Sequence, residues 1–166
     1  MSIDQPRTLV LGLGNPLLAD DAIGLEVVRS LQERLPHLAS LVEIEQDHCG
    51  GLRLMERLIG YHRAIIVDAV CTGARPGTIH LLNLGGLPTR HSTCAHDVDL
   101  ATALDLGRKS GATLPTEEHI VVIGIEAADV TTFRQGCTGD VAAAIPEALK
   151  SLIRILENWR TQTWCP

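Results

Sequence analysis

Residues 9–24, LVLGLGNPLLADDAIG, restrict the possible folds of this chain more than any other stretch. The apolar run at 9–11 predicts a buried strand, and the glycines and Asn-Pro that follow predict a tight turn. Two adjacent acids then precede an apolar helix pattern, and we expect Asp20 to be the N-cap of that helix. A strand, a glycine turn and a helix N-terminus in this order place Asp21 at the carboxyl edge of a parallel sheet, where open α/β folds bind ligands.

Strand and helix patterns alternate along the rest of the chain. The expected strands are 9–11, 41–44, 64–67, 78–82 and 119–125, and the expected helices are 24–35, 52–59, 98–106 and 141–159. This alternation predicts an α/β fold, a three-layer sandwich with a mostly parallel central sheet of about five strands flanked by helices. Gly24, on the apolar stripe of the first helix, indicates a close approach to the sheet. Pro146 predicts a later start or a kink in the last helix, whose cap we expect to be Asp140.

Composition narrows the class of protein. The 166 residues predict a single domain, 1–166, with an aliphatic core, because aromatic residues make up only 2% of the chain. A net charge of −6 argues against a nucleic-acid partner, which would require a basic face. We find no signal peptide and no run of about 18 apolar residues, so no membrane partner is expected. Five scattered cysteines without a CxxC motif predict a reduced, cytoplasmic protein.

Three side chains could form a site at the predicted sheet edge. Asp21 follows the first strand, Asp68 ends the strand at 64–67, and His96 closes a long loop at 83–97. Two carboxylates and an imidazole could together bind a divalent metal ion, or they could share general acid and base work. The residues alone leave both options open. They also leave open that the acids only form turns and that His96 is a solvated loop residue.

Three motifs resemble those of the hydrogenase maturation proteases. The first is GLGNPLLADDAIG at 12–24, the second is the apolar strand ending in Asp-Ala at 65–69, and the third is STCAHD at 92–97, with its histidine before a helix. Their order and separations agree with the family over nearly the whole chain, through 124–126 and 146–149. The three motifs together are more specific than the first alone.

The resemblance implies an activity, a partner and a site. It implies a nickel-dependent endopeptidase that removes the C-terminal extension from the precursor of a [NiFe]-hydrogenase large subunit. The implied metal contacts and catalytic residues are Asp21, Asp68 and His96, where family members have Glu or Asp at the first position. We expect the precursor to carry the nickel, because two carboxylates and one imidazole form a poorly selective, incomplete ligand set. Hydrolysis would use the metal, carboxylate acid–base chemistry as in an aspartyl protease, or both.

One segment departs from the family pattern. After the second strand, members have an acid, a glycine, a small hydroxylic residue and a glycine, whereas this chain has DHCGG at 47–51. His48 and Cys49 could be ligands, but we interpret them as loop residues without a metal role. A cysteine protease is not supported, because no cysteine has a suitably ordered histidine and orienting group.

Two other functions remain as alternatives. A non-proteolytic nickel-binding maturation chaperone would use the same Asp21, Asp68 and His96. A peptidyl-tRNA hydrolase-like esterase would share the opening GLGNP. In that family, however, the motif continues through a glycine and a tyrosine, where this chain has LLADD at 17–21. The acidic charge also suits tRNA badly.

Overall fold

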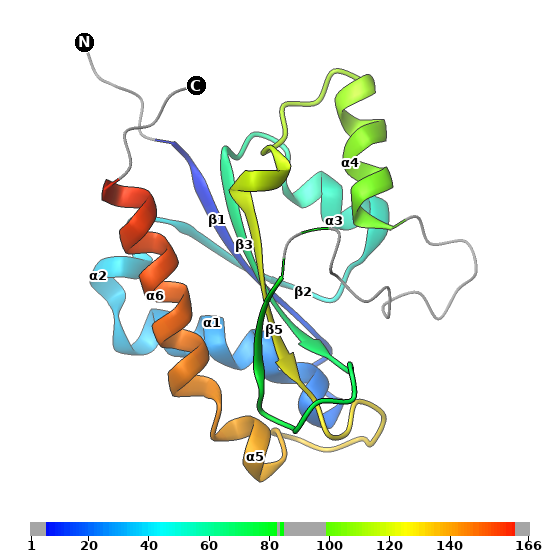
Figure 1. The fold of residues 1–166 in the computed structure, drawn as a ribbon, viewed down its shortest axis with the longest axis vertical. Coiled ribbons are helices and arrows are strands. Elements are labelled where there is room, and N and C mark those ends of the chain that lie inside the picture. The colour runs from blue at the N-terminus through cyan, green and yellow to red at the C-terminus, as the bar shows by residue number, and fades with distance from the viewer. Residues whose placement is uncertain (1–5, 83, 85–98, 162–166) are drawn as a thin grey trace.

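The core of the fold is a five-stranded sheet with the strand order β2-β1-β3-β5-β4 (Figure 1). The computed structural model describes residues 6–82, 84 and 99–161. The strands are β1 Thr8–Leu13, β2 Glu43–Asp47, β3 Arg63–Val70, β4 Ile79–Leu82 and β5 Ile120–Glu126. Neighbouring strands are parallel except for the β4–β5 pair, which is antiparallel. The predicted α/β fold with a mostly parallel sheet is therefore confirmed.

Helices cover both faces of the sheet, which makes three layers (Figure 1). One face carries α1 Ile23–Arg34, α2 Pro36–Ala39 and α6 Ile145–Thr161, and the other carries α3 Gly51–Arg57 and α4 Leu100–Lys109. The buried strand β3 alternates between the two layers, because Ile65 and Val67 pack with α1 and α6 whereas Ala64 and Ile66 pack with α3 and α4. This alternation explains why the strand is apolar at every predicted position.

The strand order reverses between β1 and β3. From β1 the chain passes to β2 on one side, and from β2 it crosses to β3 on the other side of β1. Open α/β sheets usually bind their ligands at the carboxyl ends of the two parallel strands that flank such a switch point. The register places Gly12 opposite Val67, so the residues that follow β1 and the end of β3 share one edge.

Gly24 allows α1 to lie directly on this edge. A Cβ at Gly24 would lie 2.2 Å from the carbonyl oxygen of Val67 and 2.3 Å from that of Leu13, which no side chain could occupy. On the facing strand, a Cβ at Gly12 would lie 2.5 Å from the carbonyl oxygen of Gly24. The close approach predicted from the sequence is confirmed, and it brings the start of α1 against the ends of both β1 and β3.

Replacement of Gly24 by alanine should therefore destabilise the protein, although alanine favours helices. We expect the free energy of unfolding in urea to fall by about 1–3 kcal/mol, because the new methyl group forces the helix away from the strands. Gly139→Ala is the matched control, since nothing lies within 4 Å of a Cβ at that helical glycine. A stability equal to wild type for Gly24→Ala would contradict the proposed contact.

Most element boundaries differ by a few residues from the predicted ones, and two of these differences have a clear physical reason. The second strand is Glu43–Asp47 and not 41–44, because Leu41 and Val42 still form hydrogen bonds with α2. Because β2 lies at the edge of the sheet, it can contain polar residues, and a search for apolar runs does not find such a strand. The last helix divides into α5 Gly139–Ala142 and α6, with Pro146 in the first turn of α6. The later start is confirmed, but Asp140 lies inside α5 and does not cap it.

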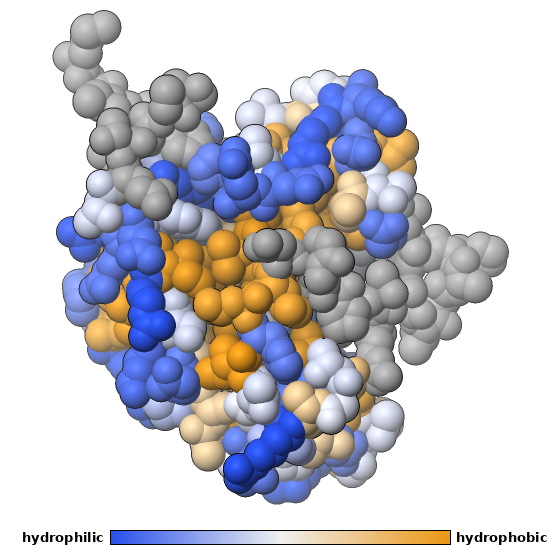
Figure 2. All heavy atoms as spheres, in the orientation of Figure 1, coloured by the Kyte–Doolittle hydropathy of each residue, from blue (hydrophilic) through white to orange (hydrophobic). Residues whose placement is uncertain are grey.

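The edge strand β4 leaves apolar surface exposed. Its Leu81 is 59% exposed, and Figure 2 shows apolar side chains gathered on the face where β4 and β5 lie.

None of the helices within residues 6–82 and 99–161 has the length and apolar character needed to cross a membrane.

Candidate active site

Asp21 is positioned by the turn between β1 and α1. It lies in the short 3-10 helix η1 Ala19–Ala22, and its Oδ2 atom accepts a hydrogen bond of 2.7 Å from the backbone N–H of Asn15. Gly14, with φ of 144°, closes this turn, since a Cβ there would lie 1.9 Å from the carbonyl oxygen of Asp21. The Gly-Asn-Pro sequence therefore fixes Asp21 over the end of β1.

Asp68 lies near the end of β3, at the same edge. Its side chain is buried, and its Oδ1 atom accepts a hydrogen bond of 2.8 Å from the N–H of Ala69. The 3-10 helix that carries Asp21 packs against β3. The structure therefore places Asp21 and Asp68 on the two sides of the switch point.

His96, the third predicted site residue, lies outside the described residues, as does most of the 83–97 loop. Within the described part of the chain, no three His, Cys, Asp or Glu side chains are close enough to hold a metal ion. The set of Asp21, Asp68 and His96 therefore stays a prediction. Both described members have the chemistry of metal ligands, because an ionised carboxylate offers two acceptor oxygens.

Asp20 does not cap the helix, and that prediction is wrong. Its side chain is fully buried and points into the loop that follows β5. Oδ2 accepts hydrogen bonds of 2.9 Å from the N–H of Ala128, the N–H of Asp129 and the hydroxyl of Thr138. Oδ1 accepts one of 2.6 Å from the N–H of Thr138. Asp20 therefore fastens residues 127–138, the loop segment, to the site.

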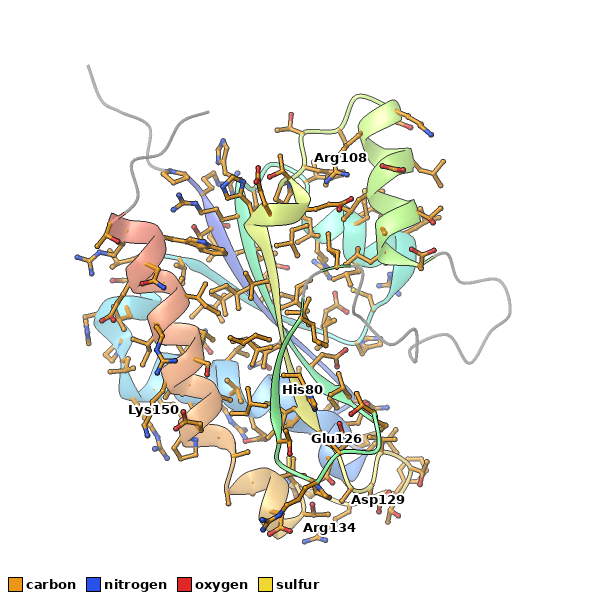
Figure 3. All side chains as sticks on the ribbon, viewed as in Figure 1. His80, Arg108, Glu126, Asp129, Arg134 and Lys150 are labelled. Atoms are coloured by element: carbon orange, nitrogen blue, oxygen red, sulfur yellow. The ribbon has the colours of Figure 1, made fainter. Side chains whose placement is uncertain are left out.

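Glu126 is a buried acid that the sequence analysis did not select. It ends β5 and accepts hydrogen bonds from the N–H and hydroxyl of Thr72 and from the N–H of Gly73. Its Oε2 atom also lies 3.2 Å from Nε2 of His80, and Figure 3 shows the two side chains side by side. Burial opposes ionisation, but these hydrogen bonds outweigh it and lower the pKa of Glu126. An acid directly after an apolar strand, as at Asp68, was the signal available in the sequence.

Asp47, at the end of β2, is also a buried carboxylate. It accepts hydrogen bonds of 2.7 Å from the N–H of His48 and from Nε of Arg57. Burial alone would raise the pKa of Asp47, but these two partners lower it overall. Asp47 therefore connects residues 47–51, the segment that departs from the family pattern, to Arg57 of α3.

Cys49 is buried, whereas the neighbouring His48 is exposed. Cys49 lies between β2 and α3 and is buried with the apolar residues under α3 and α4. Burial, together with the charge of Asp47, raises the pKa of Cys49, and the thiol is therefore neutral near pH 7. His48 is exposed at the surface. A neutral, buried thiol is a poor nucleophile, which agrees with the rejection of a cysteine protease.

Together, the fold and the site define an open α/β protein with carboxylates at the switch point of its sheet. Residues 25–155 match the family model HycI, hydrogenase maturation protease. The chain therefore belongs to the hydrogenase maturation protease family and is a peptidase. The predicted membership of this family is confirmed, and neither the chaperone nor the esterase alternative is favoured.

Individual relatives agree with this assignment. The hydrogenase 2 maturation protease of Escherichia coli K12 is 31% identical over 155 residues, which cover 92% of each chain. The hydrogenase expression/formation protein HupD of Rhizobium leguminosarum is 28% identical, over 93% of this chain and 76% of the relative. Among solved structures, the hydrogenase maturating endopeptidase HybD from E. coli is similar with a TM-score of 0.70 and 26% identity, over 92% of this chain and 93% of that one.

Proposed function

We propose that this protein removes the C-terminal extension from the precursor of a [NiFe]-hydrogenase large subunit, in the cytoplasm, after nickel has been inserted. The family assignment supports the reaction class. The observation that carries the proposal is the placement of Asp21 and Asp68 at the switch point, because open α/β sheets bind their ligands at this edge. The free thiols of Cys49, Cys71 and Cys137 suit a reducing compartment.

In this proposal nickel belongs to the substrate. Asp21, Asp68 and His96 supply two carboxylates and one imidazole, and the ligands already present in the precursor complete the coordination of the metal. A precursor without nickel lacks this point of attachment. Cleavage therefore depends on completed metal insertion, and this order of events prevents release of an empty large subunit.

Nickel-loaded precursor should be cleaved to a shorter product, whereas the same precursor made without nickel should stay intact. The measurement is a mass spectrum of both precursors after incubation with the purified protein, with elemental analysis of the protein itself. We expect far less than one equivalent of metal in the protein, because three ligands do not close a shell.

Equal cleavage of the two precursors, or a stoichiometric metal in the resting protein, would overturn the nickel dependence. Nickel binding without a shorter product from either precursor would instead identify a chaperone.

A further inference from the structure

The loop segment pairs with the turn that carries the site. Leu18 and Phe133 form an antiparallel bridge. The N–H of Ala19 donates to the carbonyl of Thr132 and the N–H of Arg134 donates to that of Leu17, both at 3.1 Å. Because these bonds flank the bridged pair, the N–H and C=O of Phe133 itself point away from Leu18. They form a short outward backbone edge, to which an extended peptide can add as a further strand.

Phe133 also presents an apolar side chain to solvent at this edge. It is the one phenylalanine of the chain, and the residue is 81% exposed. In an antiparallel bridge the two opposed side chains lie on the same face, so the ring shares a face with half-buried Leu18. Exposed aromatic residues next to a site are common contacts for a partner, because their burial contributes much of the binding energy.

The segment around Phe133 is held in place before any partner binds. Asp20 fixes its two ends, at residues 128–129 and at Thr138. The side chain of Asp129 accepts two further hydrogen bonds of 3.0 Å, from the N–H groups of Thr131 and Thr132. Figure 3 shows Asp129 and Arg134 at this end of the molecule. An ordered segment loses little conformational entropy on binding, so a ring placed in this way is suited to docking.

The outward edge is close to Asp21. Asp21 is three positions after Leu18 in the chain, a distance of at most about 11 Å. A bridged pair adds about 4.5 Å between Leu18 and Phe133. An extended peptide of four to six residues, at about 3.3 Å per residue, can therefore cover Phe133 and also reach the carboxylate of Asp21.

We propose that Phe133 is a docking residue for the precursor. An extended apolar stretch of the precursor, next to the bond that is cut, pairs with the outward backbone of Phe133 and packs on its ring. This inference rests on the proposed function. The precursor is the occupant favoured here because an endopeptidase needs an extended substrate at its catalytic edge, whereas a second copy of this chain bound there would obstruct that edge.

The test compares steady-state cleavage of nickel-loaded precursor by wild type, Phe133→Ser and Phe133→Leu. Loss of the ring should raise KM by about tenfold to a hundredfold with little change in kcat, and leucine should restore most of the loss. Leu41→Ser is the matched control, because Leu41 is 60% exposed but lies near Thr8 and Arg63, where β1 and β3 begin. Hydrogen exchange should also show that bound precursor protects the backbone of residues 131–134 in wild type.

The outcomes separate this inference from the proposed function. If wild type cleaves the precursor and Phe133→Ser has the same KM, or if residues 131–134 gain no protection, the docking role is wrong. If wild type does not cleave the precursor at all, the proposed function fails first. If Phe133→Ser changes the oligomeric state by sedimentation and not KM, the ring serves contacts between copies, and the inference is overturned.

Discussion

Cleavage of nickel-loaded precursor should fall by about a hundredfold to ten-thousandfold when Asp21 is replaced by asparagine, which is the usual range for loss of a catalytic acid or base. An amide is a weaker metal ligand and cannot take up a proton. It can still accept the hydrogen bond from the N–H of Asn15, so the turn should persist. Asp68→Asn and His96→Ala should have effects of similar size. The measurement is the rate of product formation under single-turnover conditions.

Asp140→Asn serves as the control for these variants, because Asp140 is an exposed acid of α5. It should cleave at the wild-type rate. Thermal unfolding of each variant separates loss of activity from loss of structure, and the transition of Asp21→Asn should match that of wild type. Normal cleavage by Asp21→Asn would remove this residue from the site.

Asp20→Asn, the neighbouring substitution, should instead destabilise the protein. The simple expectation for a helix cap is a negligible change, because asparagine caps as well as aspartate. In the structure, however, the carboxylate of Asp20 is fully buried and both of its oxygens accept hydrogen bonds. An amide would turn its NH₂ group toward one set of donors. We expect a loss on the order of 4 kcal/mol in the free energy of unfolding, because the buried NH₂ group would face N–H donors without an acceptor and the charge-assisted hydrogen bonds would be lost.

Calorimetry should show a midpoint of thermal unfolding lowered by roughly 10 °C for this variant. Asp105→Asn is its control, because that carboxylate is 66% exposed on α4 and should leave the midpoint unchanged. Limited proteolysis should also cut within residues 127–138 of Asp20→Asn earlier than in wild type. A midpoint equal to wild type would show that the hydrogen bonds of Asp20 contribute little.

The sequence predicts the features of this fold that depend on near neighbours. The strand β3 could be predicted from its run of apolar residues. The close approach at Gly24 could be predicted because a glycine lies on the apolar stripe of a helix. The role of Asp20 could not be found in this way, because its partners lie 108 to 118 residues further along the chain. A local rule assigns an acid before a helix to the cap, and only the packing of the loop segment shows otherwise.

The same distinction between near and distant partners applies to the candidate site. The positions of Asp21 and Asp68 follow from the rule that parallel strands end at a common edge, so they could be predicted. The same rule applies to Glu126, which ends a strand parallel to β3. Its partners Thr72 and His80 could not be predicted, because they belong to β4 and the connection before it, and β4 runs antiparallel to β5. An alternating α/β pattern gives no sign of that reversal.

One peptide bond joins Asp20 to Asp21. Asp20 holds the loop segment in place through hydrogen bonds, and Asp21 is the proposed reactive group. A shift of the loop segment would therefore also shift Asp21. If the loop segment were replaced by that of a relative to change specificity, its hydrogen bonds to Asp20 would change, and the position of Asp21 would change with them. Successful exchange between family members should require that residues 19–22 and 127–138 be moved together.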